Sequence, residues 1–159
     1  MTDSLEARVG KALRARGYTL ALAESCTGGL IGHRLTNIPG SSDYFLGDII
    51  AYSYEAKERV LGVHHRTLYE HGAVSRETAI EMARGARQAL GADIGLSVTG
   101  IAGPTGGLPG KPVGLTWIAI STREEETAHE HTWQGDRETN KELSASAALE
   151  MLLAALGRG

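Results

Sequence analysis

The sequence predicts an α/β protein in which a mostly parallel or mixed sheet lies between two layers of helices, a three-layer α/β/α sandwich. Three observations carry this prediction. Short apolar runs of strand length alternate with longer segments in which apolar residues recur at helical spacing. Glycine or proline separates most of these segments. A strand, a glycine turn and a helix follow one another over residues 18–38, which is typical of parallel sheets.

The composition is that of one soluble globular domain over residues 1–159, with 42% hydrophobic and 22% charged residues. The net charge of −3 predicts no direct binding to nucleic acid and no attraction to anionic membranes. The single cysteine excludes an internal disulfide and fits a reducing compartment. No stretch approaches the roughly 18 apolar residues of a membrane span, and no signal pattern is present. We therefore expect a cytoplasmic protein.

The first half is predicted to hold two strands among short helices. Gly17 ends the first helix, Gly28 and Gly29 turn the first strand into the second helix, and Gly47 precedes the second strand. The predicted elements are helices over 4–16, 30–38, around 55–59 and 66–71, and strands over 18–23 and 48–52, with a short turn capped by Ser41, Ser42 and Asp43.

The second half is predicted to hold two long helices and three strands. Ser75 and Asp136 are the N-caps of the helices over 75–90 and 136–156. Strands are predicted over 93–98, 113–121 and 127–133, the second of them central because it is apolar on both sides and the third at an edge because it alternates. A glycine-rich loop, residues 99–112, separates the first two, so both long loops are expected at one edge of the sheet.

Ser25, Cys26 and Thr27 place three hydroxyl or thiol groups where the first strand ends. A serine hydroxyl becomes a nucleophile when a base takes its proton. Lys57 follows the second strand, so Ser25, Tyr52 and Lys57 converge if the first two strands are neighbours. Desolvation can make a lysine such a base, although a solvated helix lysine is the simpler interpretation.

Cys26 is the rival nucleophile, because a thiol is more reactive and a helix N-terminus lowers its pKa. The alternative is a small buried side chain. Adjacent residues at a strand end point to opposite sides, so Ser25 and Cys26 are not expected to share a pocket. These physical arguments do not choose between the two.

The glycine loop can present backbone N–H groups to a phosphate or an oxyanion, although it can also be a shaped surface loop. It matches neither a P-loop nor a dinucleotide-binding pattern. Asp136-Arg137 can hold an anion or serve only as a helix cap. His129 and His131 lack a suitably spaced carboxylate or thiol, so we predict no metal site.

The segment Ala23-Glu24-Ser25-Cys26-Thr27-Gly28-Gly29 resembles the signature of the CinA C-terminal domain family. Further segments agree in order and spacing over nearly the whole chain. They are Pro39-Gly40-Ser41-Ser42, Ala51-Tyr52-Ser53 with Lys57, Gly72-Ala73-Val74-Ser75, residues 99–104 through 111–114, and Gly135-Asp136-Arg137.

This resemblance implies an amidohydrolase that converts nicotinamide mononucleotide to nicotinate mononucleotide and ammonia in pyridine-nucleotide salvage. It also implies a three-layer α/β/α fold, no metal or cofactor, self-association as a homo-oligomer, and a stand-alone form without the N-terminal domain of some relatives. The family's catalytic serine, tyrosine and lysine fall on Ser25, Tyr52 and Lys57. Ser25 is then the nucleophile, Lys57 the base, and Tyr52 orients Lys57 or shares the proton path.

The remaining site residues are expected to bind substrate. Glu24 is expected to contact the ribose or support Lys57, and backbone N–H groups near Thr27-Gly28 or in the glycine loop are expected to hold the oxyanion. The glycine loop or Arg137 is expected to hold the phosphate. The full set is Glu24, Thr27, Gly28, Ser41, Ser42, Thr99, Gly100, Gly103, Gly106 and Arg137.

The chain departs from the family pattern at two positions. Tyr54 stands where asparagine is frequent, and Lys141 stands where arginine is common, which weakens a bidentate phosphate contact. Two other functions stay open. One is a non-catalytic nucleotide-binding module that acts in competence or DNA-damage responses, and the other is an amidase for another small amide.

Overall fold

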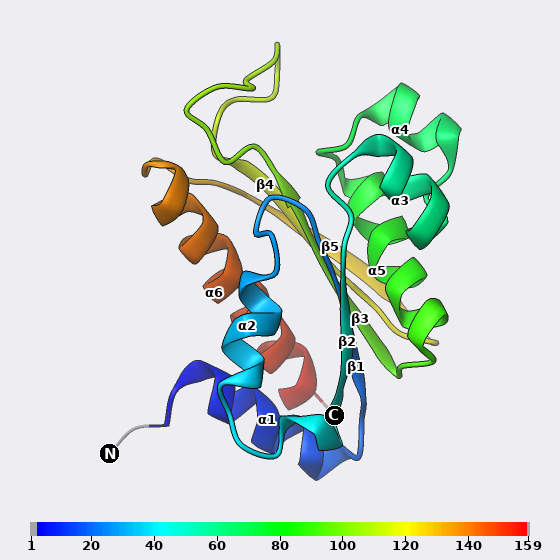
Figure 1. Cartoon of the computed structure of the whole chain (residues 1–159), viewed down its shortest axis with the longest axis vertical. Helices are drawn as coiled ribbons and strands as arrows, with labels where there is room; N and C mark the ends of the chain where they lie inside the picture. Colours follow the sequence, from blue (N-terminus) through cyan, green and yellow to red (C-terminus); the bar gives the residue numbers. More distant parts are fainter. Residues whose placement is uncertain (1–2, 159) are drawn as a thin grey trace.

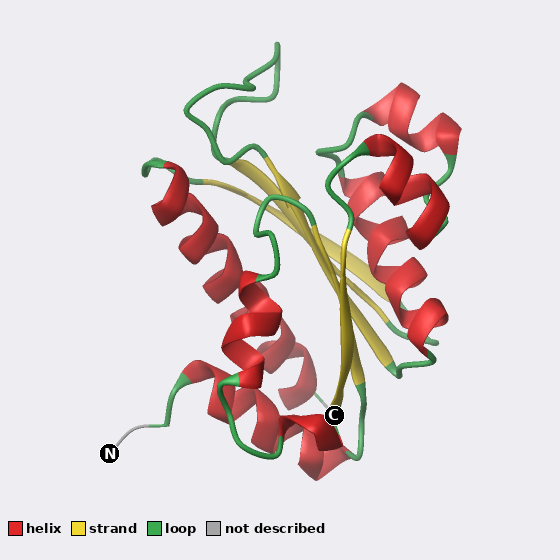
Figure 2. Ribbon diagram, in the orientation of Figure 1, coloured by secondary structure: helices red, strands yellow, loops and turns green. Residues whose placement is uncertain are grey.

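The computed structural model describes residues 3–158 as a five-stranded mixed sheet between two layers of helices, which confirms the predicted α/β/α sandwich (Figures 1 and 2). The strand order is β2-β1-β3-β4-β5, with β2, β1 and β3 parallel and β4 and β5 antiparallel. Residues 1, 2 and 159 of the predicted domain lie outside the described part. The strands are β1 (Leu20–Glu24), β2 (Phe45–Ile50), β3 (Ile94–Gly100), β4 (Leu115–Ser121) and β5 (Glu126–Thr132).

Helices α3, α4 and α5 cover one face of the sheet, and α1, α2 and α6 cover the other (Figure 1). β1 is buried between the two layers. Leu20 and Leu22 pack toward α1, α2 and α6, whereas Ala21 and Ala23 pack toward α3 and α5. The helices are α1 (Leu5–Arg16), α2 (Leu30–Thr36), α3 (Tyr54–Leu61), α4 (His65–His71), α5 (Arg76–Leu90) and α6 (Arg137–Gly157), with a 3₁₀ turn at Ser41–Asp43.

Ser75 and Asp136 cap α5 and α6 as the sequence predicts, whereas the predicted capping by Ser41, Ser42 and Asp43 is wrong, because the 3₁₀ turn follows Gly40 and, within residues 3–158, has no side-chain cap. The side chains of Ser75 and Asp136 accept hydrogen bonds from the backbone N–H groups of Thr78 and Thr139. Gly17 adopts the left-handed conformation, at φ +66°, that ends α1.

Strand boundaries differ from the predicted ones by up to three residues. β1 and β3 begin later and run further than expected, and β2 ends two residues before Tyr52 because Ala51 and Tyr52 already lead into α3. β4 pairs on both sides but lies next to the edge, and the central strand is β3. The apolar pattern of β4 reflects helices on both of its faces rather than a central place in the sheet.

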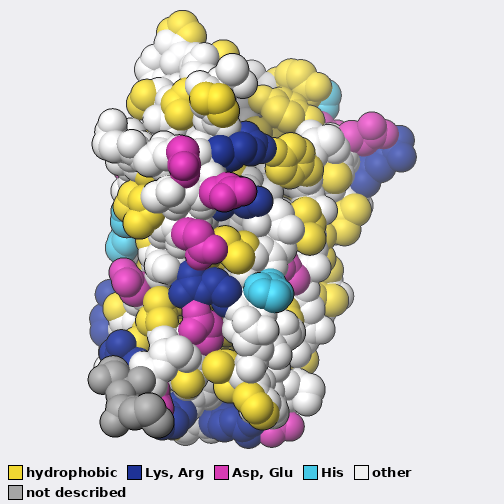
Figure 3. Space-filling view, turned by 60° about the vertical axis from the view of Figure 1, so that its left-hand side comes forward, with side chains coloured by type: hydrophobic (Ala, Val, Ile, Leu, Met, Phe, Trp, Pro, Cys, Tyr) yellow, Lys and Arg dark blue, Asp and Glu magenta, His cyan; other side chains and the backbone are white. Residues whose placement is uncertain are grey.

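The carboxyl ends of β1, β2 and β3 meet at one edge of the sheet, at the top of Figure 1, together with the glycine-rich loop before β4. The prediction that both long loops share an edge is therefore confirmed. On the face of the α1, α2 and α6 layer, acidic and basic side chains are interspersed (Figure 3). None of the helices described over residues 3–158 is long and apolar enough to cross a membrane.

Candidate active site

Ser25 and Lys57 meet at the carboxyl edge of the sheet. Ser25 follows the last residue of β1, and its N–H donates to the carbonyl of Val98 on β3, 3.0 Å away. Lys57 lies one turn into α3, and its Nζ is 3.0 Å from the Ser25 Oγ. Because β1 and β2 are parallel neighbours, the chain that leaves β2 brings Lys57 over the end of β1, as the sequence predicts.

Lys57 is 1% exposed and has no carboxylate partner among its hydrogen bonds. Its Nζ donates to the carbonyls of Ala51, at 2.8 Å, and Tyr52, at 3.2 Å. Burial away from water lowers the pKa of the Lys57 ammonium to about 8. The amine is therefore partly neutral near physiological pH.

The three polar neighbours of Lys57 fit the neutral amine. The two carbonyls can only accept, so they retain the two N–H groups that remain after deprotonation. The lone pair is then left for Ser25, whose hydroxyl can donate. This arrangement suits proton transfer from Ser25 to Lys57.

Cys26 points to the other side of the strand end. It is buried in the apolar cluster beneath α1, α2 and α6, whereas Ser25 faces α3. Burial is the main cause that raises the pKa of the Cys26 thiol to about 12. The sequence left Ser25 and Cys26 as alternative nucleophiles. The geometry favours Ser25, because it is Ser25 that contacts a base.

The turn after Ser25 supplies free backbone N–H groups. Gly28, at φ +59°, donates its N–H to the Ser25 carbonyl. Within residues 3–158 the N–H groups of Cys26, Thr27 and Gly29 donate to no backbone carbonyl. These groups stand between Ser25 and the start of α2, where an oxyanion would be stabilised.

Tyr52 contacts Lys57 through its carbonyl rather than its phenol. The side chain is 60% exposed, and its hydroxyl accepts a hydrogen bond from Arg137 Nη2 at 3.0 Å. Arg137 Nη1 donates to the Gly103 carbonyl at 2.7 Å. Tyr52 can thus orient Lys57 through its carbonyl, while its ring turns outward to the first turn of α6 and has Arg137 as its hydrogen-bond partner. Arg137 ties Tyr52 to the glycine loop.

The side chains of Glu24 and Thr27 turn away from the Ser25 side, which corrects the prediction that Glu24 contacts the ribose or Lys57, whereas the backbone N–H of Thr27 remains a predicted oxyanion donor. Glu24 is fully buried, and its Oε1 accepts from the Thr27 hydroxyl at 2.5 Å. The backbone N–H groups of Ile31 and Gly32 also donate to its carboxylate. Full burial therefore keeps Glu24 from a ribose, and it lies on the opposite face from Lys57.

Thr99 and Gly100 are also used internally. The Thr99 hydroxyl donates to the Ala73 carbonyl at 2.8 Å, which ties β3 to the turn before α5. A Cβ on Gly100 would lie 2.6 Å from Thr116 Oγ1, so the glycine permits close strand packing. The expected substrate contacts of these two residues are corrected to structural ones, whereas the exposed Gly106 lies at φ +100° in the loop.

Ser41 and Ser42 lie at the other end of the molecule. They form the 3₁₀ turn that leads into β2, and β2 runs parallel to β1. Their turn is therefore at the amino edge of the sheet, a full strand length from Ser25. The prediction that these serines bind substrate beside Ser25 is not met within one chain.

Two further residues of α6 lie near the site, of which Lys141 was linked to a phosphate contact from the sequence and Asn140 was not assigned. Asn140 is buried, donates to the Ala102 carbonyl and accepts from the N–H of Gly135, so it joins α6 to the glycine loop. Lys141 lies beside the Ser25 turn, since a Cβ on Gly28 would be 3.9 Å from its Nζ. The i, i+4 spacing of Arg137 and Lys141 on one helix was the available signal.

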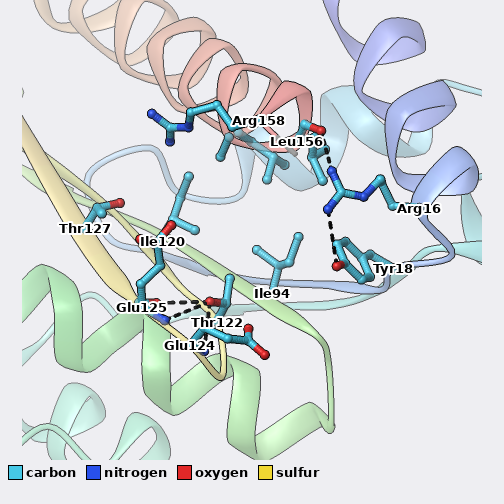
Figure 4. A pocket seen from close by; sticks show the side chains of 12 residues that line it. Arg16, Tyr18, Ile94, Ile120, Thr122, Glu124, Glu125, Thr127, Leu156 and Arg158 are labelled. Carbon is cyan, nitrogen blue, oxygen red and sulfur yellow. Dashed lines mark hydrogen bonds between the residues drawn. The ribbon is translucent and has the colours of Figure 1, made fainter.

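A cavity of about 170 Å³ lies at the amino edge of the sheet, far from Ser25. It is bounded by Tyr18 before β1, Thr122 after β4 and the end of α6. Figure 4 shows Arg16 on one side of it, where Nη1 donates to the Leu156 carbonyl at 2.8 Å. Within residues 3–158 no group of three or more His, Cys, Asp or Glu side chains is placed to hold a metal ion.

Comparison with known proteins agrees with the sequence motifs. A CinA-like protein of Salinibacter ruber is 58% identical over 147 residues, which are 92% of this chain and 36% of the relative. A CinA-like protein of Geobacter metallireducens is 49% identical over 150 residues, 94% of this chain and 36% of the relative. The chain thus spans about a third of the length of these curated relatives.

Two solved structures have the same fold. A CinA superfamily protein from Klebsiella pneumoniae superposes with a TM-score of 0.94 at 35% identity, over 98% of this chain and 97% of that one. A competence/damage inducible protein from Agrobacterium tumefaciens gives 0.92 at 41% identity, over 97% and 94%. The family described as CinA C-terminal domain matches residues 2–156. The chain belongs to the CinA C-terminal domain family.

Proposed function

We propose that the protein hydrolyses the carboxamide of nicotinamide mononucleotide to nicotinate mononucleotide and ammonia. The observation that carries this proposal is the buried contact of 3.0 Å between Lys57 Nζ and Ser25 Oγ. A serine paired with a desolvated lysine is a known arrangement for acyl transfer. The choice of this substrate rests on the family motifs that surround the pair.

In the first half-reaction, the Ser25 Oγ attacks the carboxamide carbon while Lys57 Nζ takes the hydroxyl proton. The carbonyl π electrons move to oxygen, and the N–H groups of Cys26, Thr27 and Gly29 are available to stabilise that oxyanion. One such donor typically contributes about 10²–10³ in rate. The intermediate then collapses as the C–N bond breaks. The Lys57 ammonium gives its proton to the leaving nitrogen, so ammonia departs and an ester on Ser25 remains.

In the second half-reaction, water attacks the ester carbon and Lys57 takes the water proton. Collapse of the second oxyanion breaks the bond to Ser25 Oγ, which regains a proton from Lys57. The acid passes its remaining water proton to solvent, and nicotinate mononucleotide leaves as the carboxylate. Lys57 returns to the neutral amine, so the cycle consumes one water and needs no cofactor.

Recognition of the nucleotide phosphate is assigned to the cations of α6. Lys141 lies beside Gly28, and Arg137 reaches over the glycine loop at Gly103. Both face the edge at which Ser25 lies. Arg137 already holds two partners, so Lys141 is the cation that we expect to contact the phosphate first.

The proposal is tested by incubating the full chain with nicotinamide mononucleotide and measuring ammonia and nicotinate mononucleotide. Ser25→Ala is expected to reduce turnover by about 10³-fold or more. The variant has no nucleophile, so Lys57 has no hydroxyl to activate. Cys26→Ala is the matched control and is expected to keep turnover.

The competing functions give different results. Thermal stabilisation by the nucleotide without ammonia release would favour the non-catalytic binding module. Equal turnover of amides that lack the phosphate would favour an amidase of another specificity. An inactive Cys26→Ala with an active Ser25→Ala would overturn the serine mechanism.

A further inference from the structure

A second cluster of buried ionisable groups lies on the opposite face of the strand end that carries Ser25. Glu24 is the last residue of β1, and its carboxylate is fully buried beneath α2. It accepts hydrogen bonds from Thr27 Oγ1 at 2.5 Å and from the N–H groups of Ile31 and Gly32, both at 3.1 Å. Glu24 therefore connects both ends of the turn that follows Ser25.

Asp48, on β2, brings a second carboxyl group to Glu24. It pairs with Leu22 across the sheet and lies on the same face as Glu24, and both carboxyl groups meet at Gly32, whose N–H donates to Glu24 Oε2. Its Oδ2 faces α2, since a Cβ on Gly32 would be only 2.6 Å away. Its Oδ1 is buried and has no hydrogen-bond partner in the described chain. Two carboxyl groups this close together, one fully buried and the other half-buried, favour a state that retains a proton between them.

We propose that Asp48 is a positioning residue for the nucleophile: as a neutral acid it donates a hydrogen bond to Glu24, which in turn fixes Thr27 and the start of α2 behind Ser25. Glu24 remains the carboxylate because its other three partners are donors. Within residues 3–158 no donor reaches the buried Asp48 Oδ1, and the Gly32 N–H donates to Glu24 Oε2. The proton therefore belongs on Asp48.

Among the described residues, no positively charged side chain pairs with Glu24 or Asp48. On α2, Arg34 is engaged by Glu6, and His33 is exposed. Lys57 from α3 and Lys141 from α6 act on the Cys26 thiol. Neither lysine contributes to the pKa of Asp48, which burial and the Glu24 carboxylate raise to about 9. Above that pH, two adjacent carboxylates repel each other and the turn behind Ser25 loosens.

This inference rests on the proposed function for its kinetic consequence. Turnover rises as the Lys57 ammonium loses its proton near pH 8, and it falls as Asp48 loses its proton near pH 9. The result is a narrow alkaline optimum. The fall is caused by a group that touches neither the substrate nor Lys57.

The test compares the pH profile of the wild type with that of Asp48→Asn, whose amide donates to Glu24 at every pH. We expect the variant to keep the rise through pH 8 and to lose the fall above pH 9, with a KM at pH 8 within about twofold. Asp43→Asn is the matched control, since Asp43 is exposed and pairs with Arg14, and it should retain the fall. A fall that persists in Asp48→Asn overturns the proposal.

Melting temperatures give a readout that does not need activity. The pKa of Asp48 is higher in the folded than in the unfolded chain, so the folded chain binds the extra proton between about pH 4 and pH 9. As the pH rises across that range, the wild type should therefore lose stability relative to Asp48→Asn. A difference in Tm that does not change with pH overturns the proposal, even if no turnover of the nucleotide is found.

The wild type alone provides a third measurement, which also applies if Asp48→Asn does not fold. The ¹³C resonance of the Asp48 carboxyl should titrate with a midpoint above pH 7. A midpoint near pH 4 overturns the proposal. Absence of ammonia release, with the predicted titration present, would reject the proposed function and leave the assignment of Asp48 intact.

Discussion

Residues 24 and 25 separate two buried ionisable clusters on opposite faces of one strand end. On the α3 face, burial lowers the pKa of Lys57, and on the α2 face, burial raises the pKa of Asp48. Both shifts favour the neutral form, and both come from the same cause, the loss of water around a charge. A perturbed pKa therefore does not by itself distinguish the two clusters.

The difference lies in what each neutral group can still do. Neutral Lys57 has a lone pair, and its only neighbour able to donate is the Ser25 hydroxyl, 3.0 Å away. Neutral Asp48 has a proton, and its neighbour is a carboxylate that already accepts three hydrogen bonds. The first pair can activate a nucleophile, whereas the second can only hold a turn. Burial shifts the pKa of both groups, but the chemical role of each depends on the donor or acceptor that its neutral form leaves unused.

Among the variants that test this comparison, Lys57→Met should have the largest effect. We expect ammonia release to fall by about 10³-fold, within the range of general-base catalysis. The folded chain binds the Lys57 proton more weakly than the unfolded one, so the wild type is penalised below pH 8 and gains stability from about pH 8 to pH 10.5. The variant should therefore melt higher than the wild type at pH 7. Full activity in Lys57→Met would remove Lys57 as the base.

Gly32→Ala tests the packing of the acidic cluster. The new Cβ would lie 2.6 Å from Asp48 Oδ2 and 3.3 Å from Asp48 Cβ, so the carboxyl must move. Overpacking of this kind costs about 1–3 kcal/mol, measured as the free energy of unfolding in urea. Gly157→Ala is the control, because nothing lies within 4 Å of its Cβ and the variant should be as stable as the wild type. Equal stability of the two variants would show that the acidic cluster accommodates the added methyl group without strain.

Lys141→Met tests which side of the site holds the phosphate. We expect KM for the mononucleotide to rise about tenfold, or about 1.4 kcal/mol, with kcat within twofold. The same variant should leave turnover of the riboside, which lacks the phosphate, unchanged. Lys11→Met is the matched control on an exposed lysine paired with Asp3. A loss of equal size on the riboside would assign Lys141 to the oxyanion or to packing instead.

Tyr52→Phe should have the smallest effect. The variant loses only the exposed hydrogen bond from Arg137, since Lys57 uses the Tyr52 carbonyl. We expect kcat/KM to change by less than about threefold, because an exposed hydrogen bond contributes little net free energy. A loss of 10²-fold or more would return the phenol to the proton path.

The sequence was sufficient to predict most of the helices and strands that position the site. Apolar runs, caps and glycines predicted each helix and strand, and the motif spacing predicted that Ser25 and Lys57 meet once β1 and β2 are neighbours. The errors concern side chains next to glycine turns. Glu24 was expected at the ribose or at Lys57, and the structure turns its side chain to the start of α2. Ser41 and Ser42 belong to a family motif, yet they precede β2 and so lie at the opposite edge.

The sequence by itself determined the layered fold, the family and the two segments that make the Ser25–Lys57 contact, because periodicity, caps and motif spacing are local properties of the chain. Only the tertiary structure decided what lies on each face of the end of β1. It chose Ser25 over Cys26, since one side chain meets Lys57 and the other lies in the core. It also brought Asp48 to Glu24, a contact that depends on strand register and on the lack of a side chain at Gly32.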